Sequence, residues 1–203
     1  MEEIAARTLD PGFGYEWTGT ALEELSSGGQ APIIFLLGLI MVFLVLSAQY
    51  ESYIDPVIIL LTVPLAILGA LSAIWLRTNI VGLVIPGQNV VNDVYCQIGL
   101  VMLIGLASKN AILIVEFANQ SRQEGMGISQ AAIYAAQQRF RPILMTAISS
   151  LIGFFPLVTA SGAGSASRWS LGTAVFGGML VATVLSLLVV PVLYIIIKSL
   201  ADR

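Results

Sequence analysis

Four long stretches without a charged residue dominate this sequence, and a fifth is interrupted by a single lysine. The uncharged stretches cover residues 26–50, 56–76, 142–167 and 169–197, and the fifth covers 94–115 and contains Lys109. A helix needs about 20 mostly apolar residues to cross a bilayer. Only 10% of the residues are charged, against roughly 25% in soluble domains, and the mean hydropathy is +0.91. The sequence therefore predicts an integral membrane protein.

We expect an all-α membrane fold with five transmembrane helices, near residues 31–49, 56–76, 95–118, 142–160 and 171–197. The alternation that is typical of membrane β-strands is missing, and the apolar segments are too long for strands. The segment 128–141 is expected to form a surface helix ahead of the fourth span. Pro142 suits the first turn of that span, where its missing N–H is not needed.

Small residues and prolines within the spans indicate how the helices pack. Small residues spaced by four let helices approach closely; the pairs are Ala66/Ala70, Gly69/Ala73 and Gly178/Ala182. Prolines inside the spans predict kinks, and they are Pro64, Pro156 and Pro191.

The basic residues predict the orientation of the chain in the membrane, because cytoplasmic loops carry an excess of Lys and Arg. With the C-terminus inside, five basic residues face the cytoplasm: Arg122, Arg139, Arg141, Lys198 and Arg203. Three then lie on the outer side: Arg7, Arg77 and Arg168. We therefore expect the N-terminus outside and the C-terminus in the cytoplasm.

Composition excludes several kinds of functional site. The sequence has no His, so a His-ligated metal site, a Ser-His catalytic pair and a His proton switch are ruled out. Its single Cys96 cannot form an intrachain disulfide. The net charge of −3 is too weak and scattered for nucleic-acid binding. We expect no metal, no other cofactor and no enzyme activity.

Lys109 is the residue that most needs an explanation, because it lies inside the third span, in GLASKNAILIVEF (105–117). A lysine at the centre of a membrane helix costs about 2.5–3.5 kcal/mol, so it normally faces a partner or a wet cavity. One interpretation is a lysine that reaches to the headgroups. The other, favoured by the apolar run that continues to Val115, is an intramembrane ion pair or a proton-relay residue. Glu116 lies near a helix end, so we expect the carboxylate partner to lie outside this chain.

A second polar cluster opens the fourth span, as RFRPILMT over 139–146. Arg139 and Thr146 are seven residues apart, so one helix face carries a guanidinium at the cytoplasmic end and a hydroxyl two turns deeper. In the alternative interpretation, Arg139 and Arg141 are positive-inside anchors. Thr146 then bonds back to the carbonyl one turn earlier, as is common in membrane helices.

These motifs occur in one order together with six further segments: PGFGYEWTG (11–19), QAP (30–32), QYES (49–52), NDVYCQIGL (92–100), GAGS (162–165) and GGM (177–179). In this order they resemble the resistance-nodulation-division (RND) efflux pumps of the hydrophobe/amphiphile multidrug branch, the AcrB-like inner-membrane subunits. The resemblance covers nearly the whole chain. It implies that the five helices are the last five of twelve, the C-terminal part of an RND membrane domain. Residues 1–30 would be a remnant of a periplasmic domain, and 31–203 the transmembrane domain.

The resemblance also implies roles for three residues. Lys109 is similar to the relay lysine that pairs with two aspartates on the family's fourth helix. Arg139 is similar to the functional arginine at the foot of the eleventh helix, and Thr146 to the relay threonine. Proton binding at those aspartates drives rotation among three protomer states. Because a buried lysine is stabilised by adjacent carboxylates, protonating one of them releases the lysine to repack.

By this resemblance the chain is the C-terminal membrane segment of a proton-driven multidrug efflux transporter, a drug/proton antiporter of the bacterial inner membrane. The resemblance implies that the pump is a homotrimer. Its implied partners are a periplasmic adaptor, an outer-membrane channel and hydrophobic drugs. The helix that carries the aspartates and nearly all of the drug-binding domain are not in this sequence, and the loop 78–91 is longer than is usual in the family. We therefore expect the chain to need the N-terminal half and to be inactive alone.

Two other classes of function remain open. One is a non-transporting membrane scaffold or assembly subunit, which would need Lys109 paired within its own oligomer. The other is a membrane-embedded enzyme, which is disfavoured because no carboxylate pair and no activated nucleophile lies in a span.

Overall fold

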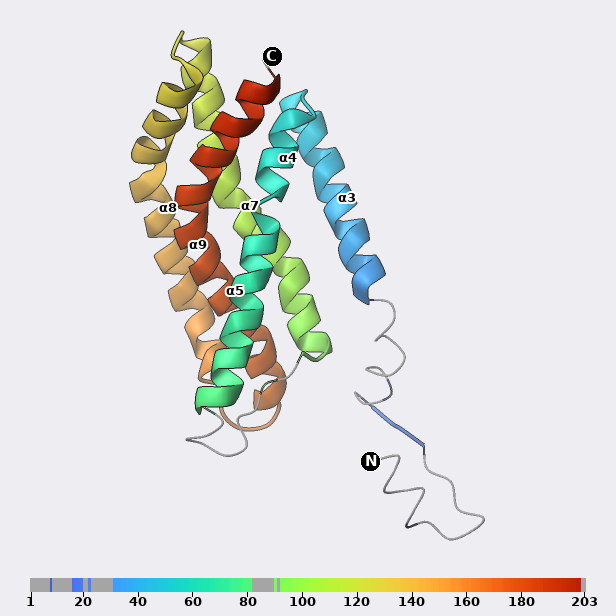
Figure 1. Cartoon of the computed structure of the whole chain (residues 1–203). Coiled ribbons are helices and arrows are strands. Elements are labelled where there is room, and N and C mark those ends of the chain that lie inside the picture. The colour runs from blue at the N-terminus through green and yellow to red at the C-terminus, as the bar shows by residue number, and fades with distance from the viewer. Residues whose placement is uncertain are drawn as a thin grey trace.

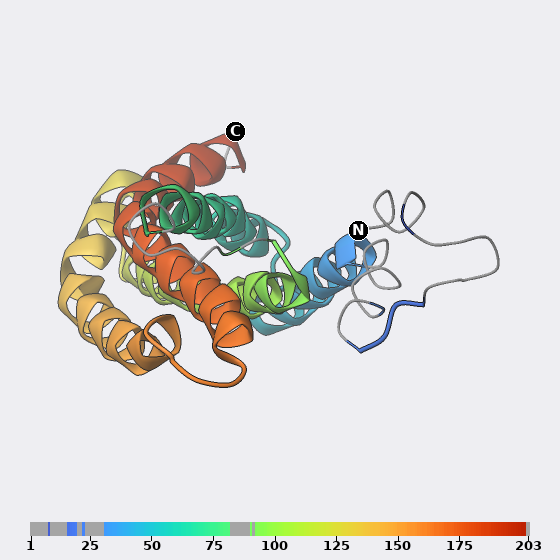
Figure 2. The same ribbon diagram turned by 90° about the horizontal axis from the view of Figure 1, so that it is seen from below.

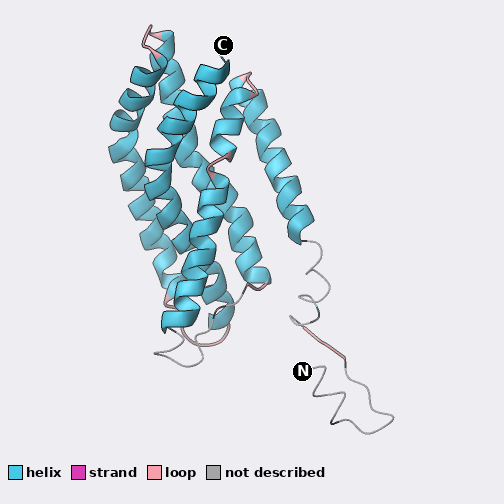
Figure 3. Cartoon of the chain, in the orientation of Figure 1, coloured by secondary structure: helices cyan, strands magenta, loops and turns pink. Residues whose placement is uncertain are grey.

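Five long helices run side by side in the computed structural model of this chain (Figure 1). It describes residues 31–81, 90 and 92–201, besides the isolated positions 8, 16–19 and 22. Most of the expected periplasmic remnant (1–30) and most of the loop 78–91 lie outside the described residues. Every regular element drawn there is a helix (Figure 3), and five of these helices are long and apolar enough to span a membrane. The predicted all-α fold with five spans is confirmed.

The helices follow one another in an up-and-down order. They are α3 (Ala31–Tyr50), α4 (Ile54–Leu60), α5 (Val63–Leu76), the π-helical turn η1 (Arg77–Val81), α7 (Val94–Gln123), α8 (Ile128–Val158) and α9 (Ser165–Ala201). The α3–α4 turn, the α7–α8 turn and the end of α9 lie at one end of the bundle, at the top of Figure 1. The predicted orientation makes this the cytoplasmic end.

Helix α9 occupies the centre of the bundle. It packs against α5, α7 and α8, whereas α3 touches mainly α4 and α7. Figures 1 and 2 both place α8 and α3 on opposite sides of the array. Among the described side chains of α3, only Leu46 is buried. An apolar helix with so little buried surface suits contact with lipid or with further membrane helices.

Small residues bring α5 and α9 into close contact. A Cβ atom placed at Gly177 of α9 would overlap the side chain of Ala73 in α5. A Cβ atom at Gly69 would lie 2.5 Å from the Cβ of Val181, which is closer than real Cβ atoms come. Association of membrane helices depends on such close packing, because lipid tails are as apolar as the helices themselves. The predicted role of Gly69 and Ala73 in helix packing is confirmed.

The second span is two helices rather than one. Pro64 has no N–H, so the carbonyl of Leu60 loses its partner one turn later, and the helix is interrupted between α4 and α5. At this interruption the Thr62 hydroxyl and the Thr62 N–H both donate to the carbonyl of Ile59, at 2.6 and 3.1 Å. The kink predicted at Pro64 is thus a break, whereas Pro156 and Pro191 lie inside the continuous α8 and α9.

Residues 128–141 are helical as expected, but they do not form a separate surface helix ahead of the fourth span. Helix α8 runs without interruption from Ile128 to Val158, and Pro142 lies inside it rather than in a first turn. Two features explain the continuation. Ala131, Ala132 and Ala135 are buried against the bundle, so packing extends through this segment. Pro142 and Gln138 are both exposed, so the proline ring, which removes the helical partner of the Gln138 carbonyl, lies on the outer face of α8 and does not disturb the packed face.

Candidate functional site

Lys109 lies midway along α7 and points toward α8. Its side chain is half-buried, and its Nζ donates to the Oγ of Ser150 in α8 at 3.4 Å. Among the described residues, no carboxylate lies within 4.0 Å of this ammonium group. The hydroxyl of a neighbouring helix is therefore the acceptor that the described part of the chain offers to this charge.

Thr146 is joined to Lys109 through Ser150. The Ser150 hydroxyl donates to the backbone carbonyl of Thr146 at 2.8 Å. The Thr146 hydroxyl itself donates to the carbonyl of Ile143 at 3.0 Å, one turn earlier, as the alternative interpretation expected. Sequence reasoning missed Ser150, because a serine in a membrane helix is usually satisfied by its own backbone and gives no signal of a contact across helices.

Arg139 lies in the N-terminal half of α8, over an aromatic ring of α7. Its Cζ is 4.7 Å from the ring centroid of Phe117, and Phe117 stacks on Tyr134 at 5.9 Å between centroids. The Nε of Arg139 is buried and has no hydrogen-bond partner in the described part of the chain. Arg141, in contrast, is exposed. Seven residues at 1.5 Å per residue place Arg139 about 10 Å from Thr146 along the helix.

Two of the three residues predicted for the site, Lys109 and Arg139, contact the facing helix between α7 and α8. The side chain of Thr146 is exposed, and only its backbone carbonyl is linked to Lys109, through Ser150. Lys109 and Thr146 share one level of the bundle, and Arg139 is two turns closer to the predicted cytoplasmic end. A further polar residue at the Lys109 level, Asn110, faces the other way. Its Nδ2 donates to the Oγ1 of Thr183 in α9 at 3.4 Å, and its buried Oδ1 has no partner among the described residues.

An ion pair that the sequence did not predict connects three helices at the predicted cytoplasmic end of the bundle; its Asp55 is buried and its Lys198 half-buried. The Nζ of Lys198 in α9 lies 2.7 Å from Oδ1 of Asp55 in α4. The Nδ2 of Asn119 in α7 donates to the other carboxylate oxygen at 2.9 Å, and the Tyr194 hydroxyl donates to Oδ1 of Asn119 at 2.8 Å. A cavity of about 420 Å³ borders this cluster. No spacing in the sequence relates Asp55, Asn119 and Lys198, because they come from three different helices.

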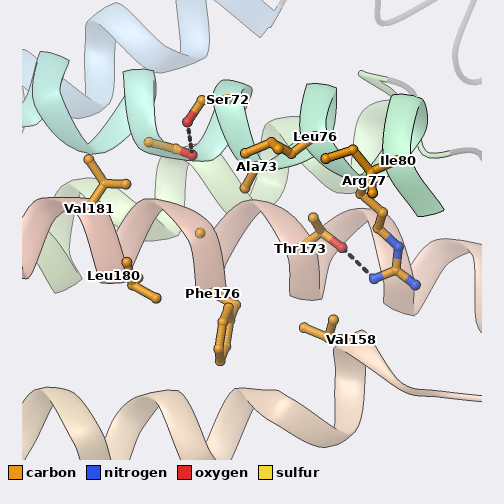
Figure 4. A pocket seen from close by; sticks show the side chains of 12 residues that line it. Ser72, Ala73, Leu76, Arg77, Ile80, Val158, Thr173, Phe176, Leu180 and Val181 are labelled. Atoms are coloured by element: carbon orange, nitrogen blue, oxygen red, sulfur yellow. Dashed lines mark hydrogen bonds between the residues drawn. The ribbon is translucent and has the colours of Figure 1, made fainter.

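Arg77 lies at the opposite end, beside an apolar cavity of about 550 Å³ between α5 and α9 (Figure 4). It is only 8% exposed, although the sequence indicated no more than a basic residue on the outer side. Its Nη1 donates to the Oγ1 of Thr173 at 2.7 Å, and its Cζ is 5.5 Å from the centroid of Trp169. The Trp169 indole donates in turn to the carbonyl of Ala160 at 2.6 Å. Arg77 therefore belongs to the packing between η1 and α9.

Comparison with known proteins identifies the family. The model of the AcrB/AcrD/AcrF family matches residues 1–198, which is nearly the whole chain. The chain belongs to the AcrB/AcrD/AcrF family. This confirms the resemblance stated from the motifs, and the described bundle is a multi-pass membrane segment of that family.

Members of the AcrB/AcrD/AcrF family with known names are similar along the entire chain. The chain is 46% identical over 200 residues to the toluene efflux pump membrane transporter TtgB of Pseudomonas putida. It is 45% identical over 204 aligned residues to the multidrug resistance protein MdtF, and 43% identical over 199 to the multidrug export protein AcrF, both of Escherichia coli. The matches cover 98–100% of this chain, and the chain spans about 18% of the length of these relatives.

Proposed function

We propose that this chain works as the C-terminal membrane segment of a proton-driven efflux transporter that exchanges drugs for protons across the bacterial inner membrane. The proposed proton relay contains Lys109, Arg139 and Thr146. The single observation that carries this proposal is Lys109, a lysine in the middle of a membrane-spanning helix whose closest described polar neighbour is the hydroxyl of Ser150. An intramembrane lysine is expensive, and function is the usual reason for its presence.

The proposed mechanism follows from the electrostatics of a low-dielectric interior. A lysine ammonium there needs carboxylates close by, and protonation of one carboxylate weakens its hold on the lysine. Released from that attraction, Lys109 can shift relative to α8, which it already contacts through Ser150. Because α7 and α8 both pack against α9, a shift at this interface would reach the centre of the bundle. Proton binding would in this way be converted into helix movement.

The remaining part of the transporter would supply what the relay lacks. We propose that the carboxylate partners of Lys109 come from the N-terminal half of the same pump. By family resemblance the pump is a homotrimer that works with a periplasmic adaptor and an outer-membrane channel. Hydrophobic compounds are the proposed cargo, in keeping with the multidrug and toluene efflux in the names of the relatives.

A chimera tests this function. The segment of TtgB that matches this chain is replaced by the chain, and drug resistance is measured in a host without its own pump. The chimera should restore resistance, whereas the 203-residue chain alone should confer none, because the described residues place no carboxylate within 4.0 Å of Lys109. A membrane-inserted chimera without resistance, or resistance from the chain alone, would contradict the proposal.

Two arginines provide a matched pair of variants within the chimera. Arg139 is half-buried over the Phe117 ring, and Arg141 is exposed. Arg139→Ala should therefore abolish most of the resistance, whereas Arg141→Ala should leave it close to that of the parent. Equal effects of the two variants would reduce Arg139 to a positive-inside anchor.

A further inference from the structure

Three consecutive polar residues in the middle of α7 have three different kinds of partner. The Ser108 hydroxyl donates to the carbonyl of Ile104 in its own helix. Asn110 contacts Thr183 in α9. Lys109 contacts Ser150 in α8. At this level of the bundle, the Ser150 side chain is thus the group of α8 that contacts the Lys109 ammonium.

The orientation of the Ser150 hydroxyl is fixed by a second hydrogen bond. Its proton is donated to the Thr146 carbonyl at 2.8 Å, so its lone pairs are left to accept from the Lys109 ammonium at 3.4 Å. A hydroxyl that donates on one side is polarised and becomes a better acceptor on the other. The chain from Lys109 through Ser150 to Thr146 therefore has one direction and joins α7 to α8.

Other charged groups on the elements that pack against α7 lie far from this level. Asp55 lies in the first turn of α4 and is paired with Lys198 near the end of α9. Arg141 and Arg139 lie nine and eleven residues before Ser150, about 13 and 16 Å along α8. In the described part of the chain, Ser150 is the side chain through which α8 acts on the Lys109 charge.

We propose that Ser150 is a positioning residue for Lys109, holding its ammonium group against α8 one turn from Thr146. This inference rests on the proposed function, in which the position of the Lys109 charge sets the state of the relay. When a carboxylate of the N-terminal half becomes protonated and releases Lys109, the Ser150 hydroxyl receives the ammonium. Movement of the lysine is thereby passed to the helix that carries Thr146 and Arg139.

The lysine content of the chain provides a direct test of the positioning. Lys109 and Lys198 are its two lysines, so ¹⁵N-lysine labelling of the full chain in lipid bilayers gives two Nζ signals. Lys198, paired with Asp55, serves as the internal reference for an intact fold. Ser150→Ala should change the chemical shift of the Lys109 Nζ signal and increase its mobility, and Ser150→Thr should restore the parent signal. Ser149→Ala, at the exposed neighbouring position, should change neither signal.

Drug-driven proton flux in the chimera with TtgB provides the second readout. Ser150→Ala should lower the maximal rate about three- to tenfold with little change in the drug concentration for half-maximal rate, and Ser150→Thr should restore it. If Ser150→Ala, like the control Ser149→Ala, changes neither the Lys109 signal nor the flux, the positioning role is overturned. If instead flux persists in the Lys109→Ala chimera, the proposed relay fails. The Lys109 signal of the parent chain and its Ser150 variants still tests the Ser150 contact, so the two failures are distinguishable.

Discussion

Lys109 and Lys198 lie in opposite electrostatic surroundings. Lys198 is near the predicted cytoplasmic end and forms an ion pair with the buried Asp55, which Asn119 also contacts. Lys109 is at mid-helix and contacts a neutral hydroxyl. Lys198 thus holds helices of this chain together, whereas Lys109 has a positive charge that no described carboxylate balances. This contrast separates a structural lysine from the proposed relay lysine.

The ion pair between Asp55 and Lys198 should contribute measurably to stability. Removal of one partner from a buried pair leaves an uncompensated charge and costs about 3–5 kcal/mol. Asp55→Asn or Lys198→Met alone should therefore lower the thermal midpoint of the bundle in detergent clearly. The double variant should lose less than the sum of the two single variants, because no charge is then left unpaired. Strictly additive losses would contradict the pair, and the exposed Glu51→Gln should be neutral.

At this scale the sequence revealed the charged residue inside a membrane span, whose burial costs free energy, and missed the neutral polar residues of the spans. Lys109 could be singled out because a charge in an apolar run needs an explanation. Ser150 and Asn110 could not, because a hydroxyl or amide in a membrane helix has several ways to be satisfied. The pairing of Asp55 with Lys198 depends on how α4 and α9 meet, and residue spacing carries no information on that.

At the scale of helices, apolar length determined the number of spans but not their limits. Five uncharged or nearly uncharged stretches predicted five helices, and the structure has them. The predicted helix ends were wrong where packing or a proline outweighed the apolar pattern of the sequence. Helix α8 passes through Pro142 because buried alanines extend the contact with the bundle. The second span breaks before Pro64, although its apolar sequence is continuous.

The contact between α5 and α9 should be sensitive to a single methyl group. Gly177→Ala would place a Cβ on the side chain of Ala73, and overpacking of this kind typically costs about 1–3 kcal/mol. The thermal midpoint in detergent should therefore fall. Gly105→Ala is the matched control, because Gly105 lies in α7 with nothing within 4 Å of its Cβ position; it should be neutral or slightly stabilising. Equal midpoints for the two variants would argue against close packing of α5 on α9.

At the scale of the whole molecule, the described bundle corresponds to a small part of its relatives. The chain spans about 18% of the length of TtgB, so TtgB is more than five times longer. Helix α3 has little buried surface, and Arg139 has a buried nitrogen without a partner among the described residues. Both features leave room for contacts with the rest of a pump.

The orientation in the membrane can be measured with reporter fusions. The turn at Glu124 and the C-terminus should be cytoplasmic, and the turn at Gly162 periplasmic, because the basic residues are more numerous on the first side. Fusions of an alkaline phosphatase and a fluorescent protein at these positions report the two sides. Phosphatase activity at Glu124 together with fluorescence at Gly162 would reverse the orientation.

The most direct test of the central claim is drug-driven proton flux in everted vesicles that contain the chimera with TtgB. In the parent chimera, addition of a transported drug should partly collapse the imposed pH gradient. Lys109→Ala should abolish this response at equal expression and assembly. Lys109→Arg should rescue it poorly, because a planar guanidinium does not replace a compact ammonium, and Ser149→Ala should respond as the parent does. An undiminished response from Lys109→Ala would contradict the claim that this lysine couples protons to efflux.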